Sequence, residues 1–552
     1  MAACIYYHPE AYTTSGPKLM GRNAAGESFL RGFLKYTKTS SFLSVHVENG
    51  EHTKHFAATA EKAGRIEEIR SYTKQNLGGL KEAGVVYLPG PAMGAHAFHR
   101  RLYGDANWSL SGITHTTSSS IAMDAIAELL TAPIKPWDSL ICTSSAVKKN
   151  VEAILQAQAD YLKERLGVSK LELPLLPVIP LGIHTEDFDF TEKQKKIARK
   201  KIGVKDGDLV VLYAGRLSFH AKAHPLAMYL GLEAAAKKAK RSVVLVESGW
   251  HANPAIAEAF AEAAKVACPS VRVINIDGRE EEGRRNGWAS ADIFCSLSDN
   301  IQETFGIVPI EAMAAGLPVV VSDWDGYKDT VRDGIDGFRI KTMAPKQGLG
   351  SDLALRHALG IDTYDYYCGY SSSLVAISVD GVAKAFTELF GSEELRKKMG
   401  NSGKNRAQNE YDWKEIIKKY ELLWDKQDRI RSAEQKRNKD SLLPSIWPAR
   451  LDPTISFSHY PTKTLTLDTP LRLVHGDSKT SLGILQKHRN LKMLDFATLV
   501  IPTNGELDHV LNTLSDEPKK ASEILMGIEK ARQPYVLRGL GWLAKIGIID
   551  FS

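Results

Sequence analysis

Cysteine is scarce in this sequence, and its spacing does not suit a disulfide framework or a zinc site. The five cysteines are odd in number and scattered, and none lies in a C-x-x-C spacing: Cys4, Cys142, Cys268, Cys295 and Cys368. Disulfide-stapled secreted domains and structural zinc sites both rely on regularly spaced pairs. The pattern favours a reducing compartment, and we expect the protein to be cytoplasmic.

Targeting segments and strong charge are missing as well. The N-terminal stretch Met1–His8 has no basic region followed by an apolar one, so no signal peptide is predicted. No apolar run is long enough to span a bilayer. The net charge of +6 over 552 residues is small. It mildly favours anionic partners such as nucleotides or a phospholipid surface, which leaves peripheral membrane contact open, and it does not indicate nucleic acid.

Several catalytic motifs are absent too. The sequence has no H-E-x-x-H, no G-x-S-x-G and no Walker A motif, which argues against a zinc peptidase, an α/β-hydrolase and a P-loop enzyme. Two D-x-D stretches, Asp187–Asp189 and Asp323–Asp325, have the carboxylates that bind a divalent ion. Such a short motif often arises by chance, so structural or capping roles are favoured and no metal site is predicted.

What the sequence does contain is a βαβ pattern. Short apolar runs alternate with amphipathic stretches up to about residue 440, which predicts parallel sheets. Predicted strands include Ala3–Tyr7 and Val85–Leu88 in the first half, and Leu209–Ala214 and Ile293–Ser296 in the second. A predicted helix covers Pro254–Cys268. The length requires two or three domains.

Proline-rich and charged segments mark the predicted domain boundaries. Leu175–Thr185 is rich in proline and has no helical period, so we place an N-terminal domain at 1–180 and a second domain at 181–440. A further boundary falls near Ser441–Pro453. The appended domain, 450–552, is predicted to be small and mostly helical.

The end of the appended domain has a recognisable pattern. Tyr535–Phe551 is an apolar helix followed by a short strand, which is winged-helix-like. Its charges nearly balance, so DNA binding is disfavoured and a protein partner or self-association is favoured. Within the second domain, Thr342–Ser373 interrupts the pattern. Its tyrosines either line a pocket or, as we expect, pack on one another in a surface excursion.

The most informative segment is Glu303–Glu311. It places a carboxylate on a loop, then Gly306, then Glu311 in the first turn of a predicted helix. Backbone N–H groups at a helix start bind phosphate oxygens. The two carboxylates can accept hydrogen bonds from sugar or ribose hydroxyls. The segment therefore predicts a nucleotide-sugar site.

Cations follow a predicted strand of the same domain. Arg216 and Lys222 come after Leu209–Ala214, where a guanidinium and an ammonium can neutralise a diphosphate. Plain surface charge is the alternative. Two weaker candidates lie in the first domain: the glycine turn at Gly21, and His115 in a run of small polar residues.

These elements together resemble the GT-B glycosyltransferases of family 4, which are retaining enzymes that use nucleotide-sugars. Gly215-Arg216-Leu217 with Lys222, followed by the Glu-x7-Glu of Glu303 and Glu311, carries the resemblance. Three further stretches agree: Ile179–Ile183, Ala291–Phe294 and Ser322–Phe338. The resemblance covers roughly residues 1–425. It implies an α/β fold with two facing Rossmann-like domains, each with a parallel sheet, plus the C-terminal domain.

The resemblance also implies roles for the matching positions. Arg216 and Lys222 hold the donor diphosphate and stabilise the leaving group, although family members often space these residues five apart rather than six. Glu311 binds the ribose and Glu303 the donor sugar. The remaining implied donor-site residues are Gly21 at the β-phosphate, His115 near the transferred sugar, and Thr304, Phe305, Gly306 and Ile307 around the sugar and phosphate.

The expected function is therefore transfer of a hexose-type sugar, as in polysaccharide biosynthesis. The donor is UDP- or GDP-linked, the acceptor is a sugar, glycan or lipid, and no cofactor or metal is expected. One alternative is a non-catalytic nucleotide-sugar-binding scaffold or sensor that acts through its C-terminal domain. Another is a winged-helix regulator with a transferase-like sensor. A homo-oligomer or a protein partner through the C-terminal domain stays open.

Overall fold

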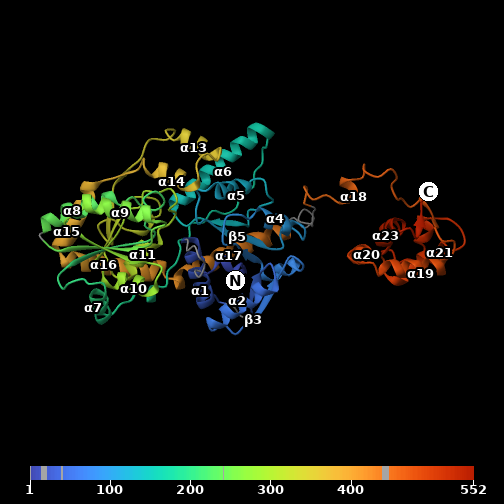
Figure 1. The fold of residues 1–552 in the computed structure, drawn as a ribbon, viewed down its shortest axis with the longest axis horizontal. Coiled ribbons are helices and arrows are strands. Elements are labelled where there is room, and N and C mark those ends of the chain that lie inside the picture. Colours follow the sequence, from blue (N-terminus) through green and yellow to red (C-terminus); the bar gives the residue numbers. More distant parts are fainter. Residues whose placement is uncertain (1, 14–20, 39–40, 240, 438–446, 552) are drawn as a thin grey trace. The chain divides into compact units, whose positions relative to one another are not determined.

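The computed structural model describes residues 2–13, 21–38, 41–239, 241–437 and 447–551 (Figure 1). The chain divides into two compact units, Met1–Trp447 and Pro448–Ser552, and each is described by itself. The predicted boundary segment Ser441–Pro453 falls across this division, and its residues 441–446 lie outside the described part. No helix among the described residues combines the length and the apolar character needed to cross a membrane.

The first sheet of the larger unit has six parallel strands in the order β3-β2-β1-β4-β5-β6. The strands are β1 (Cys4–Tyr6), β2 (Phe42–His46), β3 (Glu68–Tyr72), β4 (Val85–Tyr87), β5 (Ser109–Ile113) and β6 (Ser139–Ile141). The strands β4, β5 and β6 are buried throughout. Burial on both faces is the usual condition of a parallel sheet covered by helices.

The second sheet repeats this design, with six parallel strands in the order β12-β11-β10-β7-β8-β9. Its strands are β7 (Leu209–Ala214), β8 (Val243–Gly249), β9 (Arg272–Asp277), β10 (Ile293–Ser296), β11 (Val319–Ser322) and β12 (Gly337–Ile340). Counted from its own first strand, each sheet has the order 3-2-1-4-5-6 of a doubly wound nucleotide-binding fold. The α/β GT-B fold class predicted from the sequence is confirmed.

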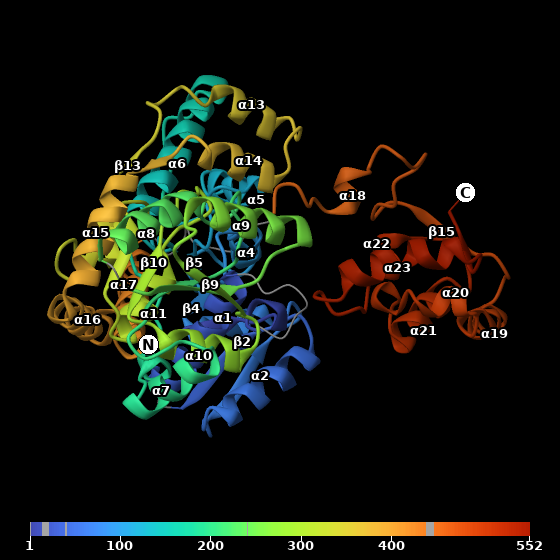
Figure 2. The same ribbon diagram turned by 60° about the vertical axis from the view of Figure 1, so that its left-hand side comes forward.

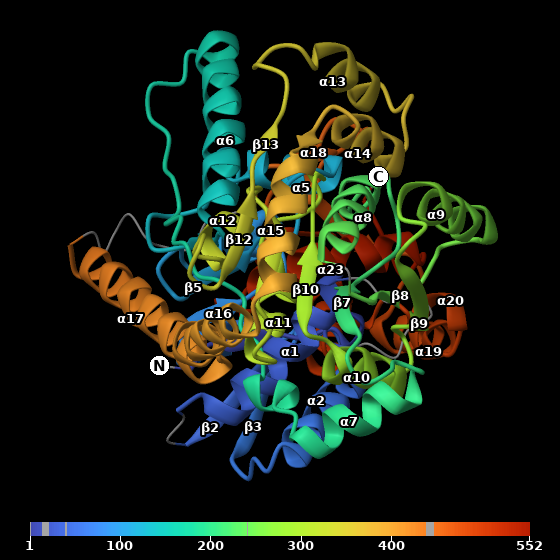
Figure 3. The same cartoon turned by 90° about the vertical axis from the view of Figure 1, so that its left-hand side faces the viewer.

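Helices cover both faces of each sheet (Figures 2 and 3). Those of the first half are α1 (Gly21–Tyr36), α2 (Gly50–Lys62), α3 (Leu80–Ala83), α4 (Gly94–Arg101), α5 (Ser120–Glu128) and α6 (Ser145–Leu166). Those of the second half are α7 (Glu192–Lys201), α8 (Leu226–Ala239), α9 (Pro254–Ala267), α10 (Glu281–Ser290), α11 (Ile307–Ala314), α12 (Tyr327–Thr330), α15 (Val379–Gly391), α16 (Glu393–Arg406) and α17 (Trp413–Arg437). Side chains of α8, α9 and α15 share one core on one face of the second sheet.

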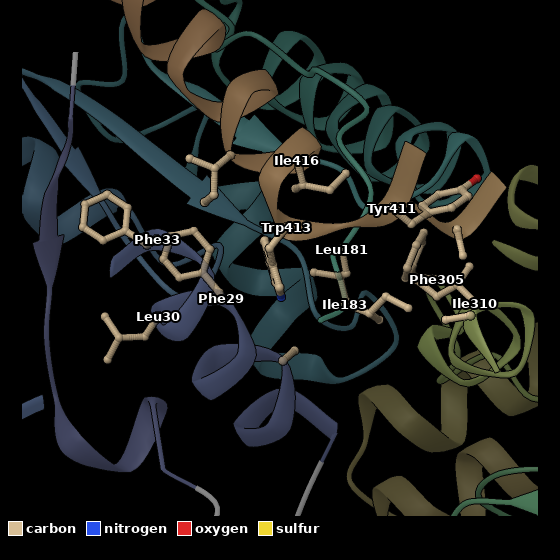
Figure 4. Packing of buried hydrophobic residues seen from close by; sticks show 14 of the residues in the cluster. Phe29, Leu30, Phe33, Leu181, Ile183, Phe305, Ile310, Tyr411, Trp413 and Ile416 are labelled. Carbon is tan, nitrogen blue, oxygen red and sulfur yellow. The ribbon is translucent and has the colours of Figure 1, made fainter. Parts of the chain in front are cut away.

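One continuous hydrophobic core joins the two halves, and Trp413 lies at its centre (Figure 4). The indole is fully buried and packs against Phe29 with ring centroids 5.7 Å apart. Its Nε1 donates to the Ser28 hydroxyl over 2.7 Å. A Cβ placed on Gly32 or on Gly182 would lie 2.5 Å from this ring, so only glycine leaves it room.

Helix α17 packs on the first half of the chain, although the domain boundary predicted at residue 440 assigned it to the second domain. The Gln427 amide of α17 donates to the carbonyls of Leu110 and Trp137, each over 2.9 Å. A buried amide must find such partners, so these bonds hold α17 on the first sheet. No local feature of the sequence indicated this return.

The stretch 342–377 is an excursion closed by a two-stranded stem. Its elements are β13 (Thr342–Met343), α13 (Ser351–Ala358), α14 (Tyr364–Ser372) and β14 (Ala376–Ile377), with Thr342 opposite Ile377. Some of its aromatics do pack on one another, as expected, with Tyr366 and Tyr370 5.8 Å apart. The excursion also contacts the first half of the chain, because Tyr364 bonds to Ser118.

The smaller unit is mostly helical around its own hydrophobic core. Its helices are α18 (Pro453–Ser456), α19 (Ser478–Arg489), α20 (Lys492–Asp495), α21 (Asn504–Thr513), α22 (Ala521–Ile524) and α23 (Gln533–Lys545). An antiparallel sheet has the order β16-β15-β17, with β15 (Pro470–Leu473), β16 (Lys519–Lys520) and β17 (Ile549–Asp550). The helix and strand predicted within Tyr535–Phe551 are present as α23 and β17, while the winged-helix comparison stays a prediction.

Candidate nucleotide-sugar site

The candidate site lies where the strand order of the second sheet reverses. The first strand of this sheet, β7, lies between β8 and β10. From the carboxyl end of β7 the chain continues to β8 on one side, whereas from that of β10 it continues to β11 on the opposite side. Ligands of open α/β sheets bind in the crevice that opens at this point. The loop after β7 carries Arg216 and Lys222, and the loop after β10 carries Glu303. These three charged candidates are therefore brought to one edge of the sheet.

Glycine lets the strand ends approach one another here. Gly215 has φ of +140°, a conformation that residues with a side chain rarely adopt. A Cβ on Gly249, at the end of β8, would lie 1.9 Å from the Gly215 carbonyl oxygen. The backbones of two neighbouring loops thus approach one another directly.

Arg216 is held by two acceptors from the same pair of loops. Its Nη2 donates to the Ala221 carbonyl over 2.8 Å and to Oε1 of Gln302 over 2.7 Å. Gln302 was missed by sequence reasoning, although it directly precedes Glu303. These bonds fix the direction of the guanidinium, which is a requirement for bidentate binding of an anion.

Lys222 and Glu303 form an ion pair across the two loops. The side chains are 24% and 10% exposed, so water screens the pair only in part. Burial alone raises the pKa of Glu303. The charge and hydrogen bond of Lys222, with backbone N–H groups of Thr304 and Gly306, outweigh that and lower this pKa below its ordinary value. Glu303 is therefore an ionised acceptor at neutral pH.

Helix α11 begins after Gly306, which has φ of +78°. A Cβ there would lie 1.9 Å from the Tyr327 ring, so glycine is required. Gly306 is also the N-cap residue and offers no side chain to the first N–H groups of α11. One expectation is wrong: Glu311 is the fifth residue of α11 and not in its first turn, because the helix starts at Ile307.

Glu311 differs electrostatically from Glu303. Burial raises its pKa to about 7, and the nearby charges of Arg284 and Lys222 oppose this only in part. The two glutamates thus differ in protonation near neutral pH. Phe305, by contrast, is 1% exposed and belongs to the core. Its side chain supports the loop, and only its backbone is available to a ligand.

The first sheet meets this site through its own carboxyl edge. His115 follows β5, and its carbonyl accepts a hydrogen bond from the Thr304 hydroxyl over 3.3 Å. Ser144, at the start of α6, donates to the Thr304 carbonyl over 2.7 Å. Ser144 was missed because its sequence signal is only that of a helix cap. Gly21 opens α1 with open space around it, and its predicted approach to the donor stays a prediction.

The aspartates of the two D-x-D stretches make ion pairs and a hydrogen bond. Asp187 pairs with Arg31 and Asp189 with Lys404, at 2.5 and 2.8 Å. Asp325 has φ of +43°, one oxygen 3.4 Å from the Ser144 hydroxyl and the other buried without a partner. Burial and the charge of Glu303 raise its pKa to about 8.

A cluster elsewhere has metal-ligating side chains. The ligand atoms of His8, Glu48 and His52, in the first half, lie within 4.8 Å of one another. Among the residues that the structure describes, no other group of three or more such side chains comes as close. His8 follows β1, Glu48 follows β2 and His52 lies in α2, so the cluster is not part of the Arg216 loops.

Comparison with known proteins finds a family that matches the part of the chain forming the second sheet and its loops. Residues 194–348 match the family described as "Glycosyl transferases group 1". The matched stretch spans β7 to β12 and includes Arg216, Lys222, Glu303 and Glu311.

Two curated proteins are similar to parts of this chain. The chain is 48% identical over 62 residues to a phosphatidyl-myo-inositol mannosyltransferase of Mycobacterium leprae, which is 11% of this chain and 16% of that protein. It is 31% identical over 186 residues to a D-inositol 3-phosphate glycosyltransferase of Geodermatophilus obscurus, 30% of this chain and 37% of that protein. The chain thus spans well under two thirds of the length of either relative.

Among solved structures, Anabaena HepE in complex with UDP and glucose is similar at 13% identity, with a TM-score of 0.47. The similarity covers 77% of this chain and 100% of that one.

Proposed function

We propose that this protein is a retaining, metal-independent glycosyltransferase. It moves a hexose-type sugar from a UDP- or GDP-linked donor to a sugar, glycan or lipid acceptor, and it needs no cofactor. The observation that carries the proposal is the convergence of Arg216, Lys222 and Glu303 at the reversal of strand order in the second sheet, with Glu311 on α11 near enough for the Lys222 charge to lower its pKa. Residues 181–440 bind the donor in this proposal, and residues 1–180 bind the acceptor.

The two cations serve the leaving group. When the bond between the anomeric carbon and the phosphate oxygen breaks, negative charge develops on the nucleoside diphosphate. Arg216 faces that charge from a fixed position and Lys222 reaches it by turning from Glu303, and positive charge at this place lowers the barrier. The N–H groups at the start of α11, beginning with that of Ile307, add donors without adding a titratable group, whereas those of Thr304 and Gly306 donate to Glu303.

The two glutamates orient the donor. Glu303 is ionised and accepts hydrogen bonds from hydroxyls of the transferred sugar, and Glu311 accepts from the ribose. A sugar hydroxyl takes the place of the Lys222 ammonium on Glu303 as Lys222 turns to the diphosphate. His115 lies at the other side of the cleft, near the transferred sugar.

The transfer step needs no strong base from the protein. The acceptor hydroxyl oxygen bonds to the anomeric carbon on the face that the phosphate leaves, and its proton passes to the departing phosphate oxygen. Retention of configuration follows from this same-face attack. Fixed orientation of both reactants supplies much of the rate in such a step.

The test begins with binding and continues with turnover. A thermal-shift screen against UDP-, GDP- and ADP-sugars identifies the donor, because a ligand bound only by the folded state raises the unfolding temperature. Release of nucleoside diphosphate is then measured with a panel of acceptors. The names of the two curated relatives put inositol phosphates and phosphatidylinositol first in that panel.

Two variants decide the residue roles. Arg216→Ala and Glu303→Ala should each abolish most turnover, and full turnover in both contradicts the proposal. Tight donor binding without transfer or donor hydrolysis on any acceptor would support the scaffold function instead.

A further inference from the structure

Helix α14 of the excursion reaches the candidate site from outside the two sheets. The stem β13–β14 anchors the excursion at the edge of the second sheet, and Arg356 of α13 holds Asp362 with two hydrogen bonds of 2.7 and 2.8 Å. Asp362 comes just before Thr363, whose hydroxyl caps α14. The excursion is therefore a tied structure that sets the position of the first residue of α14, Tyr364.

Tyr364 bonds to the loop that carries His115. Its hydroxyl lies 2.8 Å from the Ser118 hydroxyl and 3.3 Å from that of Thr116, which are themselves 3.1 Å apart. Burial raises the pKa of Tyr364, so the phenol keeps its proton at neutral pH and can donate. Three hydroxyls, one from the second half of the chain and two from the first, form one cluster.

The other contacts of α14 lead to Arg216. A Cβ on Gly369 would lie 3.1 Å from that of His220, in the Arg216–Lys222 loop, so the helix and the loop touch. The His220 carbonyl accepts from the Asn300 amide over 2.9 Å, and Asn300 in turn accepts from the backbone of Gln302 over 2.9 Å. Gln302 binds Arg216. Contacts thus run from the His115 loop through α14 to the diphosphate end of the site.

We propose that Tyr364 is a positioning residue that ties the Thr116–Ser118 loop to the Arg216 loop, so that the bound sugar reacts with the acceptor rather than with water. This rests on the proposed function. A contact between two halves of a cleft holds the site closed and excludes water from it. The Tyr364 hydroxyl needs no direct contact with the donor for this role.

The decisive variant is Tyr364→Phe, which keeps the ring and removes one hydroxyl. We expect transfer to fall about 3- to 10-fold, the range for loss of a hydrogen bond. Donor hydrolysis relative to transfer should rise, while the dissociation constant of the donor changes less than twofold, because Arg216, Lys222 and Glu311 remain. The matched control is Tyr366→Phe, whose side chain is on the same helix and 58% exposed. An unchanged ratio of hydrolysis to transfer in Tyr364→Phe overturns the proposal.

A double-mutant cycle tests the partner. Ser118→Ala should reproduce the altered ratio, and the double variant should add little, since both changes remove the same bond. Simple addition of the two effects counts against the proposal. Tyr364→Leu removes the ring as well as the hydroxyl, so we do not expect it to restore the wild-type ratio of hydrolysis to transfer.

A final measurement needs no substrate. Backbone hydrogen exchange of residues 114–119 should be faster in Tyr364→Phe than in the wild type and in Tyr366→Phe. If exchange there is unchanged, Tyr364 does not hold this loop and the inference fails. If no nucleotide-sugar binds the wild type, the proposed function fails separately, and the exchange result still decides whether Tyr364 ties the loops.

Discussion

The ammonium of Lys222 lies against the carboxylate of Glu303, and these two side chains come from loops on adjacent strands of the second sheet. The pair has a structural effect and a functional one. It neutralises a carboxylate that burial would otherwise penalise. It also keeps that carboxylate ionised, which is the form that accepts hydrogen bonds from sugar hydroxyls.

Lys222→Met should destabilise the protein by about 1–3 kcal/mol at pH 7, because it leaves a buried carboxylate without its partner. The pKa of Glu303 lies below its ordinary value in the folded protein. Its contribution to stability is therefore present at neutral pH and is lost as pH falls through the folded-state pKa. In Lys222→Met the free energy of unfolding should therefore fall less as the pH is lowered. Urea unfolding from pH 7 to pH 4 measures it, with exposed Lys265→Met as the control, and equal unfolding free energies in both variants would contradict the pairing.

Arg216→Ala should weaken binding of the nucleoside diphosphate by about 10- to 100-fold, since a charged hydrogen-bond donor to the phosphates is lost. Arg216→Lys should recover only part of the affinity, because lysine lacks the planar fork. Calorimetric titration measures both. Arg272→Ala, at the opposite end of the sheet where β9 begins, removes the same charge and should bind like the wild type.

Glu311 should make donor binding depend on pH. Its pKa is raised to about 7 by burial, so its carboxylate forms as pH rises through that value. We expect affinity for a nucleotide-sugar to increase about 3- to 10-fold between pH 6 and pH 8, with the ionised acceptor favoured by the ribose hydroxyls. Glu311→Gln should remove this slope. A slope that persists unchanged in the glutamine variant would assign the titration to another group.

Asp325→Asn should stabilise the protein at alkaline pH. The pKa of Asp325 is raised to about 8, so the folded state holds a proton that the unfolded state releases at lower pH. The stability that this proton contributes is lost as pH rises from about 4 to about 8. Asparagine cannot ionise and tolerates the positive φ at this position. At pH 8 the variant should therefore be more stable by about 1–3 kcal/mol, whereas at pH 4 the difference should vanish. Denaturant unfolding at the two pH values measures this.

Trp413→Ala should cost about 3–5 kcal/mol of unfolding free energy, the range for removing a buried aromatic ring. The ring lies in the core that both sheets share, between Gly32 and Gly182. Tyr161→Ala, whose side chain is 54% exposed, serves as the control and should cost less than about 1 kcal/mol. A small loss in Trp413→Ala would mean that α17 does not hold the two halves together.

Local features of the fold were predictable from the sequence. The strand predicted at Leu209–Ala214 has the same limits in the structure, and the helix predicted at Pro254–Cys268 ends one residue earlier. Apolar runs and helix signals act over a few residues, so they survive in any tertiary context that buries them. The positions of the site loops follow from those of the strands, because Arg216 and Glu303 lie in the loops after β7 and β10.

Contacts between distant segments were decided by the tertiary structure. Gln302 beside Arg216, Ser144 against Thr304, and the return of α17 to the first sheet each join residues far apart in the chain. The unequal pKa values of Glu303 and Glu311 have the same origin, since burial and neighbouring charge set them. The sequence by itself determined which strands form and which charged groups follow them, because these depend on short-range patterns. Only packing decided which of those groups meet, because that depends on how the two sheets face each other.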